Sequence, residues 1–117
     1  MSKNFEKKLA DLGVTLPDAP APAANYVPYV TIGSTVYVSG QISMADGALI
    51  TGKIGADLTT EEGAAAARSC AISLLAQVKK AFGGDLDTLV RVVKLTGFVN
   101  STPDYADQPK VVNGASD

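Results

Sequence analysis

The side chains that most often carry enzyme chemistry are scarce in this chain. Its 117 residues include no histidine and a single cysteine, Cys70. Without histidine the chain can form neither a Ser-His-Asp triad nor a Cys-His pair, and no metal site with imidazole ligands. Cys70 lies beside the apolar positions of a predicted helix, where burial raises the pKa of a thiol, so we interpret it as a packing residue and not as a nucleophile.

The polar groups best suited to bind a small ligand lie in the stretch Ser39-Gly40-Gln41. A serine hydroxyl next to a glycine offers both a polar side chain and unshielded backbone groups. The same pattern also fits a β-bulge that curves a sheet. Tyr29, earlier in the chain, is either a pocket residue or an ordinary tyrosine of an amphipathic strand.

Two predicted strands carry this corner. Residues 26–31 and 35–42 alternate with the period of two that strands require. Gly33-Ser34 between them suits a two-residue hairpin loop, because glycine tolerates a positive φ. Asp46-Gly47 predicts a second turn, from which residues 48–51 pair back as a short third strand. Residues 89–99 are predicted to form a further strand.

Three helices are predicted. The first lies within residues 1–13, with Ser2 as its N-cap and Gly13 just past its end as a signal that the helix stops. Thr59 and Glu62 have the spacing of a capping box that opens the second helix, and Gly83-Gly84 ends it. A third helix is predicted to begin at residues 101–104, where proline suits the first turn. The second helix has one apolar stripe, formed by Ala64, Ala67, Ala71, Leu74, Leu75, Val78 and Phe82.

A proline-rich connector, residues 16–24, separates the first helix from the strands. Its prolines exclude both helix and sheet interior, so the segment is expected to be extended. We interpret it as a lead-in along the surface. The alternative is a proline-rich ligand for another protein.

Composition excludes several classes of protein. Hydrophobic residues make up 46% of the chain and charged residues 19%, as in a folded globular domain. The net charge of -2 argues against a nucleic-acid surface, which needs clustered lysine and arginine. No apolar run approaches the roughly 20 residues that span a bilayer. The N-terminus lacks the apolar region of a secretory signal, and one cysteine fits a reducing compartment, so we expect a cytoplasmic protein.

The order of these motifs resembles the RidA/YjgF family of small trimeric imine and enamine deaminases, from about Asn25 to Asp117. The resemblance rests on a Pro-Tyr strand, a glycine turn, the run Tyr-Val-Ser-Gly-Gln-Ile at 37–42, an alanine-rich helix and the run Val-Val-Lys-Leu-Thr at 92–96. It implies an α+β fold of the chorismate-mutase-like kind, a mixed sheet with helices packed on one face. Residues 1–117 are then a single domain whose core is 25–117.

The same resemblance implies an activity. RidA-like proteins hydrolyse reactive 2-imino or enamine acids to 2-keto acids and ammonia, without a metal or organic cofactor, as homotrimers with ligand clefts between subunits. The alternative is a non-catalytic trimer that binds a small carboxylate metabolite or a protein partner. Endoribonuclease activity, attributed to some relatives, is disfavoured by the acidic balance and the missing histidine. We expect no nucleic-acid and no membrane partner.

Four positions match the binding-site pattern of that family, and they are Tyr29, Ser39, Gly40 and Asn113. The resemblance implies that Tyr29 closes the ligand pocket and that Asn113 reaches the site from a neighbouring subunit. Without the resemblance, Asn113-Gly114 is interpreted as a helix C-cap. No catalytic side chain is assigned.

RidA-like proteins continue past the position of Asp117 with the rest of the second helix and two more strands. Those strands carry an arginine that holds the substrate carboxylate and a glutamate associated with the reacting water, and a bidentate guanidinium is well suited to the first task. We therefore expect the functional protein to extend beyond Asp117. Arg68 and Arg91 lie elsewhere in the sequence and are interpreted as surface or interface charges.

Overall fold

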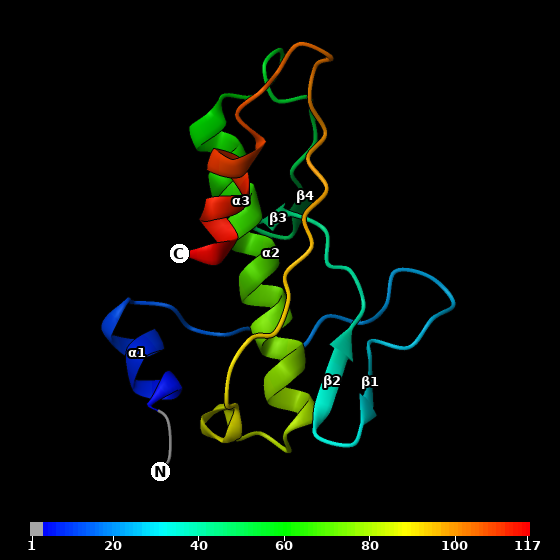
Figure 1. Cartoon of the computed structure of the whole chain (residues 1–117), viewed down its shortest axis with the longest axis vertical. Helices are drawn as coiled ribbons and strands as arrows, with labels where there is room; N and C mark the ends of the chain where they lie inside the picture. The colour runs from blue at the N-terminus through cyan, green and yellow to red at the C-terminus, as the bar shows by residue number, and fades with distance from the viewer. Residues whose placement is uncertain (1–3) are drawn as a thin grey trace. The chain divides into compact units, whose positions relative to one another are not determined.

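The computed structural model describes residues 4–117, so the predicted cap Ser2 lies outside the described residues. The chain forms two compact units. Unit 1 comprises Met1–Gly40 and Ile72–Val92, and unit 2 comprises Gln41–Ala71 and Val93–Asp117. The long helix α2 (Thr60–Ala81) contributes to both units (Figure 1). The expectation of a single domain stays a prediction.

The first element pair of unit 1 is the predicted hairpin. β1 (Tyr29–Ile32) pairs antiparallel with β2 (Thr35–Val38), and Tyr29 lies opposite Val38. Gly33 has a φ of 60°, the positive value that the first position of a tight hairpin loop requires. Both strands are shorter than predicted at the end away from the turn. Before β1, the Tyr26 N–H donates to the carbonyl of Ala24 in a local turn.

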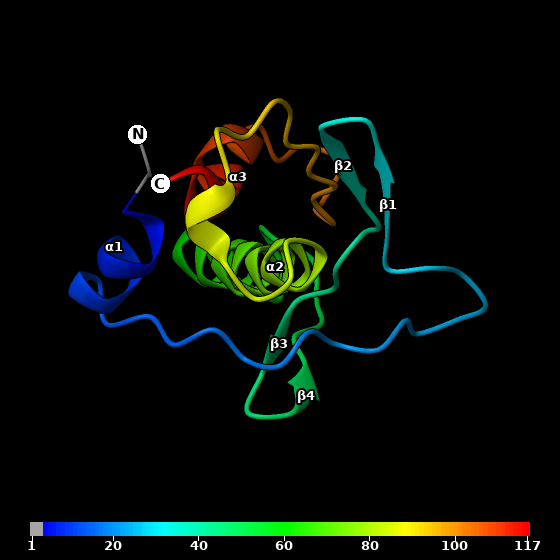
Figure 2. The same cartoon turned by 90° about the horizontal axis from the view of Figure 1, so that it is seen from below.

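The hairpin has one covered face and one open face. Opposed residues of an antiparallel pair share a face, so Tyr29 and Val38 lie together, and both are half-buried. On the other face Ile32 is 64% exposed and Tyr37 is 62% exposed. The hairpin lies beside the C-terminal half of α2, which belongs to the same unit (Figures 1 and 2).

Helix α1 (Phe5–Asp11) ends as the sequence predicted. Gly13 has a φ of 72°, and its N–H donates to Ala10 O while the Val14 N–H donates to Leu9 O. This pair of bonds is a Schellman motif, which satisfies carbonyls at the end of a helix. After α1, the connector crosses the C-terminal half of α2 from one side to the other (Figures 1 and 2).

Helix α2 begins and ends at the predicted signals. The Thr59 N–H donates to Glu62 Oε1 (3.0 Å), and the Glu62 N–H donates to Thr59 Oγ1 (3.1 Å), which is a reciprocal capping box. The N–H groups of Gly83 and Gly84 form a second Schellman motif at the other end. The predicted apolar stripe of this helix is half-buried throughout, whereas Ala76 and Gln77 are buried. The short 3-10 helix η1 (Leu86–Thr88) follows, and Leu86 is buried.

Unit 2 contains a second small hairpin and a helix pair. β3 (Met44–Ala45) pairs with β4 (Ala48–Leu49) around the predicted Asp46-Gly47 turn, where both residues have positive φ. Helix α3 (Gln108–Ser116) packs on the N-terminal half of α2. The core of this unit includes Ile54 and Val111, both 5% exposed.

Two predicted elements differ from the structure. Residues 89–99 form no strand, because no other segment of 4–117 pairs with them, and Val90, Val92 and Val93 remain exposed. The third helix begins at Gln108 and not at residues 101–104. Ser101 instead forms a bridge with Ile54, and the Tyr105 N–H closes a turn on Thr102 O. The predicted strand at residues 89–99 and the predicted helix start at residues 101–104 were both wrong.

Candidate functional site

The Ser39 corner is built directly on the end of the first hairpin. Ser39 follows the last residue of β2, and its N–H donates to Pro28 O at 2.9 Å. Its hydroxyl donates to Val27 O at 2.6 Å. Two bonds thus hold Ser39 against the segment that enters β1. Both bonds raise the local rigidity that a binding site needs.

Tyr29 and Gly40 lie at the same end of the hairpin as Ser39. Tyr29 opposes Val38, the residue that precedes Ser39, and Gly40 comes next in the chain. A Cβ built on Gly40 would meet nothing within 4 Å, and the φ of Gly40 is not positive. Neither internal packing nor backbone conformation therefore demands glycine at position 40. Tyr29, Ser39 and Gly40 thus lie at one end of the hairpin, and their role in binding a ligand stays a prediction.

Asn113 belongs to unit 2 and is exposed on α3. Its main-chain oxygen accepts the Asp117 N–H at 2.9 Å. The helix runs through Asn113 and Gly114 to Ser116, so the alternative interpretation as a C-cap is not what the structure shows. Whether Asn113 shares a site with Tyr29, Ser39 and Gly40 stays a prediction.

Cys70 behaves as a protonated packing residue. Burial raises the pKa of the half-buried thiol above its ordinary value of 9.0, and a hydrogen bond with Ser69 opposes this shift only in part. The thiolate is the nucleophilic form of cysteine, so a raised pKa disfavours nucleophilic chemistry at neutral pH.

The two arginines are solvated. Arg68 and Arg91 are exposed, and neither forms an ion pair with a carboxylate among residues 4–117. Arg91 lies in the same unit as the Ser39 corner, whereas Arg68 lies in unit 2 with Asn113. In the part of the chain that the structure describes, no cluster of three acidic or cysteine side chains is arranged to hold a metal ion.

One buried polar residue, Gln77, was not predicted from the sequence. Its side chain is 1% exposed, and Nε2 donates to the connector carbonyl of Pro20 at 2.7 Å. Its Oε1 atom is buried without a hydrogen-bond partner. The available signal was a glutamine within the otherwise apolar run 74–78, but only the structure shows that the connector covers it.

These observations agree with the family to which the chain belongs. Residues 6–117 match the family described as "YjgF/chorismate_mutase-like, putative endoribonuclease", and the chain is a member of that family. Protein TCP17 from Trypanosoma cruzi is 53% identical over 110 residues, which cover 93% of this chain and 68% of that protein.

Solved structures of relatives confirm the fold. The crystal structure of Atu1372, a protein of unknown function from Agrobacterium tumefaciens, has a TM-score of 0.83 and 46% identity, covering 95% of this chain and 67% of its own. A putative endoribonuclease from Shewanella oneidensis has a TM-score of 0.89 and 37% identity, covering 95% of this chain and 74% of its own. The α+β, chorismate-mutase-like fold predicted from the sequence is thus confirmed. No helix within residues 4–117 has the length and apolar character needed to cross a membrane.

Proposed function

We propose that the protein hydrolyses reactive 2-imino or enamine acids to 2-keto acids and ammonia. The observation that carries this proposal is the Ser39 corner, where the serine N–H and hydroxyl are bonded to Pro28 O and Val27 O, just before Tyr29 begins β1. This corner is suited to bind a small polar ligand, and the chain belongs to the YjgF family. We further propose that the protein acts in the cytoplasm, since its one cysteine fits a reducing compartment.

The reaction adds water to the carbon of the C=N bond and releases ammonia, so a 2-imino acid and water give a 2-keto acid and ammonia. Binding must hold the substrate while water approaches this carbon. Ser39 and Gly40 supply polar groups at the hairpin end, and Tyr29 supplies an aromatic wall. We assign these residues to substrate binding and assign no catalytic side chain.

We also propose that the functional form is a homotrimer in which Asn113 approaches the Ser39 corner of a neighbouring subunit. The open hairpin face supports association, because Val30, Ile32 and Tyr37 leave apolar surface in water. Closed symmetry is the usual way in which identical chains bury such a surface.

The second candidate function is a non-catalytic trimer that binds a small carboxylate metabolite or a protein partner. The same open hairpin face favours it, since a partner protein would also cover apolar surface. A 2-keto acid that raises the melting temperature, without any effect on imine decay, would support this function over hydrolysis.

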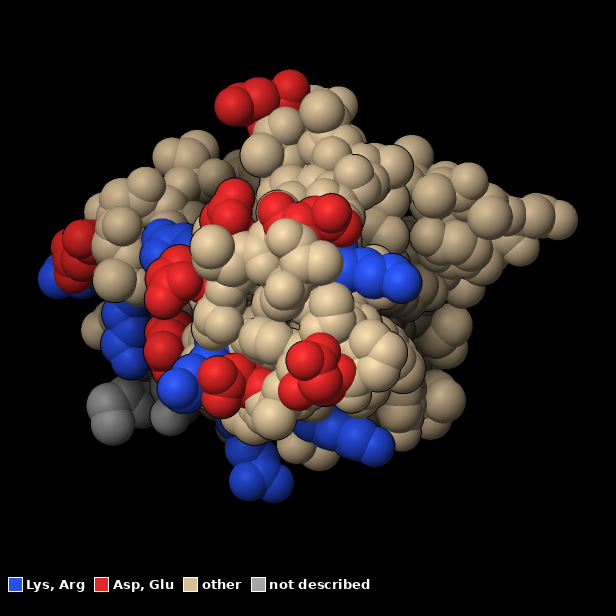
Figure 3. Space-filling model, turned by 90° about the horizontal axis from the view of Figure 1, so that it is seen from above, with Lys and Arg blue, Asp and Glu red and all other residues tan. Residues whose placement is uncertain are grey.

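Ribonuclease activity is a weaker candidate, although the family description includes the word endoribonuclease. Lys and Arg side chains are interspersed with Asp and Glu on the face shown in Figure 3. The chain carries 10 basic and 12 acidic residues, whereas binding the phosphates of RNA needs clustered positive charge. Incubation with a labelled single-stranded RNA is the direct check.

The decisive assay measures the decay of a 2-imino acid that an amino-acid oxidase generates in the cuvette, with semicarbazide as the trap. We expect the protein to accelerate decay and Ser39→Ala to reduce that acceleration about two- to tenfold, since a lost hydrogen bond to substrate costs about 0.5 to 1.5 kcal/mol. Ser34→Ala, an exposed serine at the other end of the same hairpin, is the matched control. Decay at the uncatalysed rate with folded protein would refute hydrolysis.

A further inference from the structure

The N-terminal part of unit 1 makes polar contacts with α2 and η1 through Glu6 and the carbonyl of Pro20. We call residues 4–24, which comprise α1 and the connector, the N-terminal strap. The strap meets the rest of its unit at the end of α2 and at η1. It crosses the C-terminal half of α2 (Figure 1).

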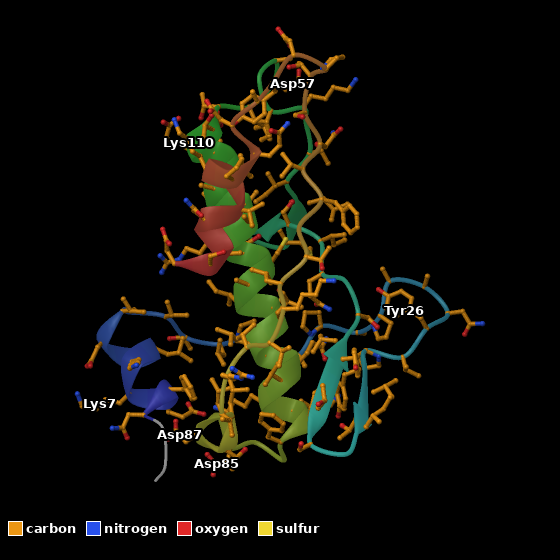
Figure 4. The ribbon with its side chains drawn as sticks, viewed as in Figure 1. Lys7, Tyr26, Asp57, Asp85, Asp87 and Lys110 are labelled. Carbon is orange, nitrogen blue, oxygen red and sulfur yellow. The ribbon has the colours of Figure 1, made fainter. Side chains whose placement is uncertain are left out.

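Glu6 makes most of the polar contacts of the strap. Its Oε1 lies 3.2 Å from Lys79 Nζ, and the same oxygen accepts the Leu86 N–H at 3.4 Å. Its own N–H donates to Asp87 Oδ1 at 2.9 Å, and Figure 4 shows Asp87 next to α1. Glu6 thus joins the strap to α2 through Lys79. It also joins the strap to η1 through Leu86 and Asp87. A further bond of the strap runs from Gln77 Nε2 to Pro20 O.

The apolar contacts of α1 are limited to half-buried side chains, Phe5 and Leu9. No residue of α1 is buried, and Leu12, its C-cap, is 67% exposed. The Lys7–Asp11 ion pair lies within the helix and is solvated on both sides, so it does not attach the helix to anything. A helix of seven residues is too short to persist alone in water. Its docking therefore depends on Glu6 and on the half-buried side chains of Phe5 and Leu9.

We propose that the N-terminal strap opens from α2 and η1 without unfolding the rest of the chain, and that Glu6 is the latch that ionic strength controls. The Glu6–Lys79 pair is about two-fifths exposed on both partners, with side-chain values of 39% and 38%, so salt reaches and weakens it. Opening uncovers Leu86, which is 1% exposed in the closed form, and the buried amide of Gln77. Partial opening of this kind occurs at lower free energy than global unfolding.

The test is native-state hydrogen exchange of the full chain at low and high sodium chloride. The reporters are the N–H groups of Lys8, Leu12 and Leu86, whose acceptors are Asn4, Lys8 and Glu6. We expect exchange at these positions to be about three- to tenfold faster in Glu6→Gln than in the unchanged protein, as loss of one partly exposed charged contact implies. We also expect the salt dependence of exchange at α1 to vanish in this variant.

Lys7→Gln is the matched control, because it removes a charge of α1 that points to solvent and should leave exchange of Leu86 unchanged. Lys79→Gln leaves Glu6 in place and should remove the same salt dependence, which keeps the proposal testable should Glu6→Gln not fold. Equal exchange rates for α1 and mid-α2 amides would overturn the strap as a separately opening unit. Equal effects of Glu6→Gln and Lys7→Gln would overturn Glu6 as its latch.

Discussion

At the scale of single residues, Gly40 distinguishes a ligand site from a purely structural corner. Position 40 has room for a methyl group and an unstrained φ, so Gly40→Ala should leave the free energy of unfolding within about 0.5 kcal/mol of the original. If a ligand approaches the backbone there, the same methyl group obstructs it. We expect Gly40→Ala to raise KM for the imino acid at least about tenfold with an unchanged melting curve. Normal kinetics in this variant would mean that no ligand passes close to Gly40.

The raised pKa of Cys70, a second feature of a single residue, predicts how stability depends on pH. Its pKa is raised in the folded chain, so the neutral thiol is favoured by folding. This contribution to stability is fully present below the pKa of the unfolded thiol and is lost as pH rises through the higher folded pKa. We expect iodoacetamide to modify Cys70 more slowly in the native protein than in urea, with the rate rising at higher pH. The loss of stability above about pH 9 should be absent in Cys70→Ala.

At the scale of elements, glycine sets the contact between α3 and α2 in unit 2. A Cβ on Gly114 would overlap the carbonyl of Ala64, whose carbon atom would lie 2.6 Å away. Backbone cannot move aside as a flexible side chain can, so Gly114→Ala should lower the free energy of unfolding by about 2 to 3 kcal/mol. Asn113→Ala, at the exposed neighbouring position, is the control and should change stability little. Denaturant titration measures both, and equal stabilities would show that the helices do not cross so closely.

The elements that local chemistry encodes were predictable from the sequence, and those that depend on a partner were not. Thr59 and Glu62 satisfy one another within a single turn, and Gly33 fits its loop by its own conformation, so the sequence alone is sufficient there. A strand requires a second strand beside it, and no described segment pairs with residues 89–99. For the third helix, both Pro103 and Pro109 are possible start signals. Pro103 lies in a turn closed on Thr102 O, and the helix begins at Gln108, next to Pro109.

The candidate site also has a part that could be predicted from the sequence and a part that could not. Tyr29, Ser39 and Gly40 are joined by one hairpin, so their proximity follows from the register that the Gly33-Ser34 turn sets. Asn113 stands on another element of another unit, and its place depends on contacts that periodicity does not encode. Gln77 was missed because a sequence does not show whether a glutamine side chain is buried or exposed. Its burial depends on the connector that covers it.

At the scale of the whole molecule, the open hairpin face predicts association. Val30, Ile32 and Tyr37 together expose an apolar surface on paired strands, and burial of apolar area stabilises by about 25 cal/mol per Å². We expect light scattering to show a homotrimer at micromolar concentration. Ile32→Lys places a charge on this face, and desolvating that charge should shift the assembly to monomers without changing the far-ultraviolet circular dichroism spectrum.

The control for this prediction is Leu12→Lys, which adds the same charge at an exposed apolar residue outside the hairpin. Trimers should persist in this variant. If the Ser39 corner is completed by Asn113 of a neighbouring subunit, Ile32→Lys should abolish imine hydrolysis together with assembly, although position 32 lies at the turn end of β1 and Ser39 follows the opposite end of β2. Active monomers would show that assembly is not needed for hydrolysis. The site would then be complete within one chain, and the trimer would serve only to cover apolar surface.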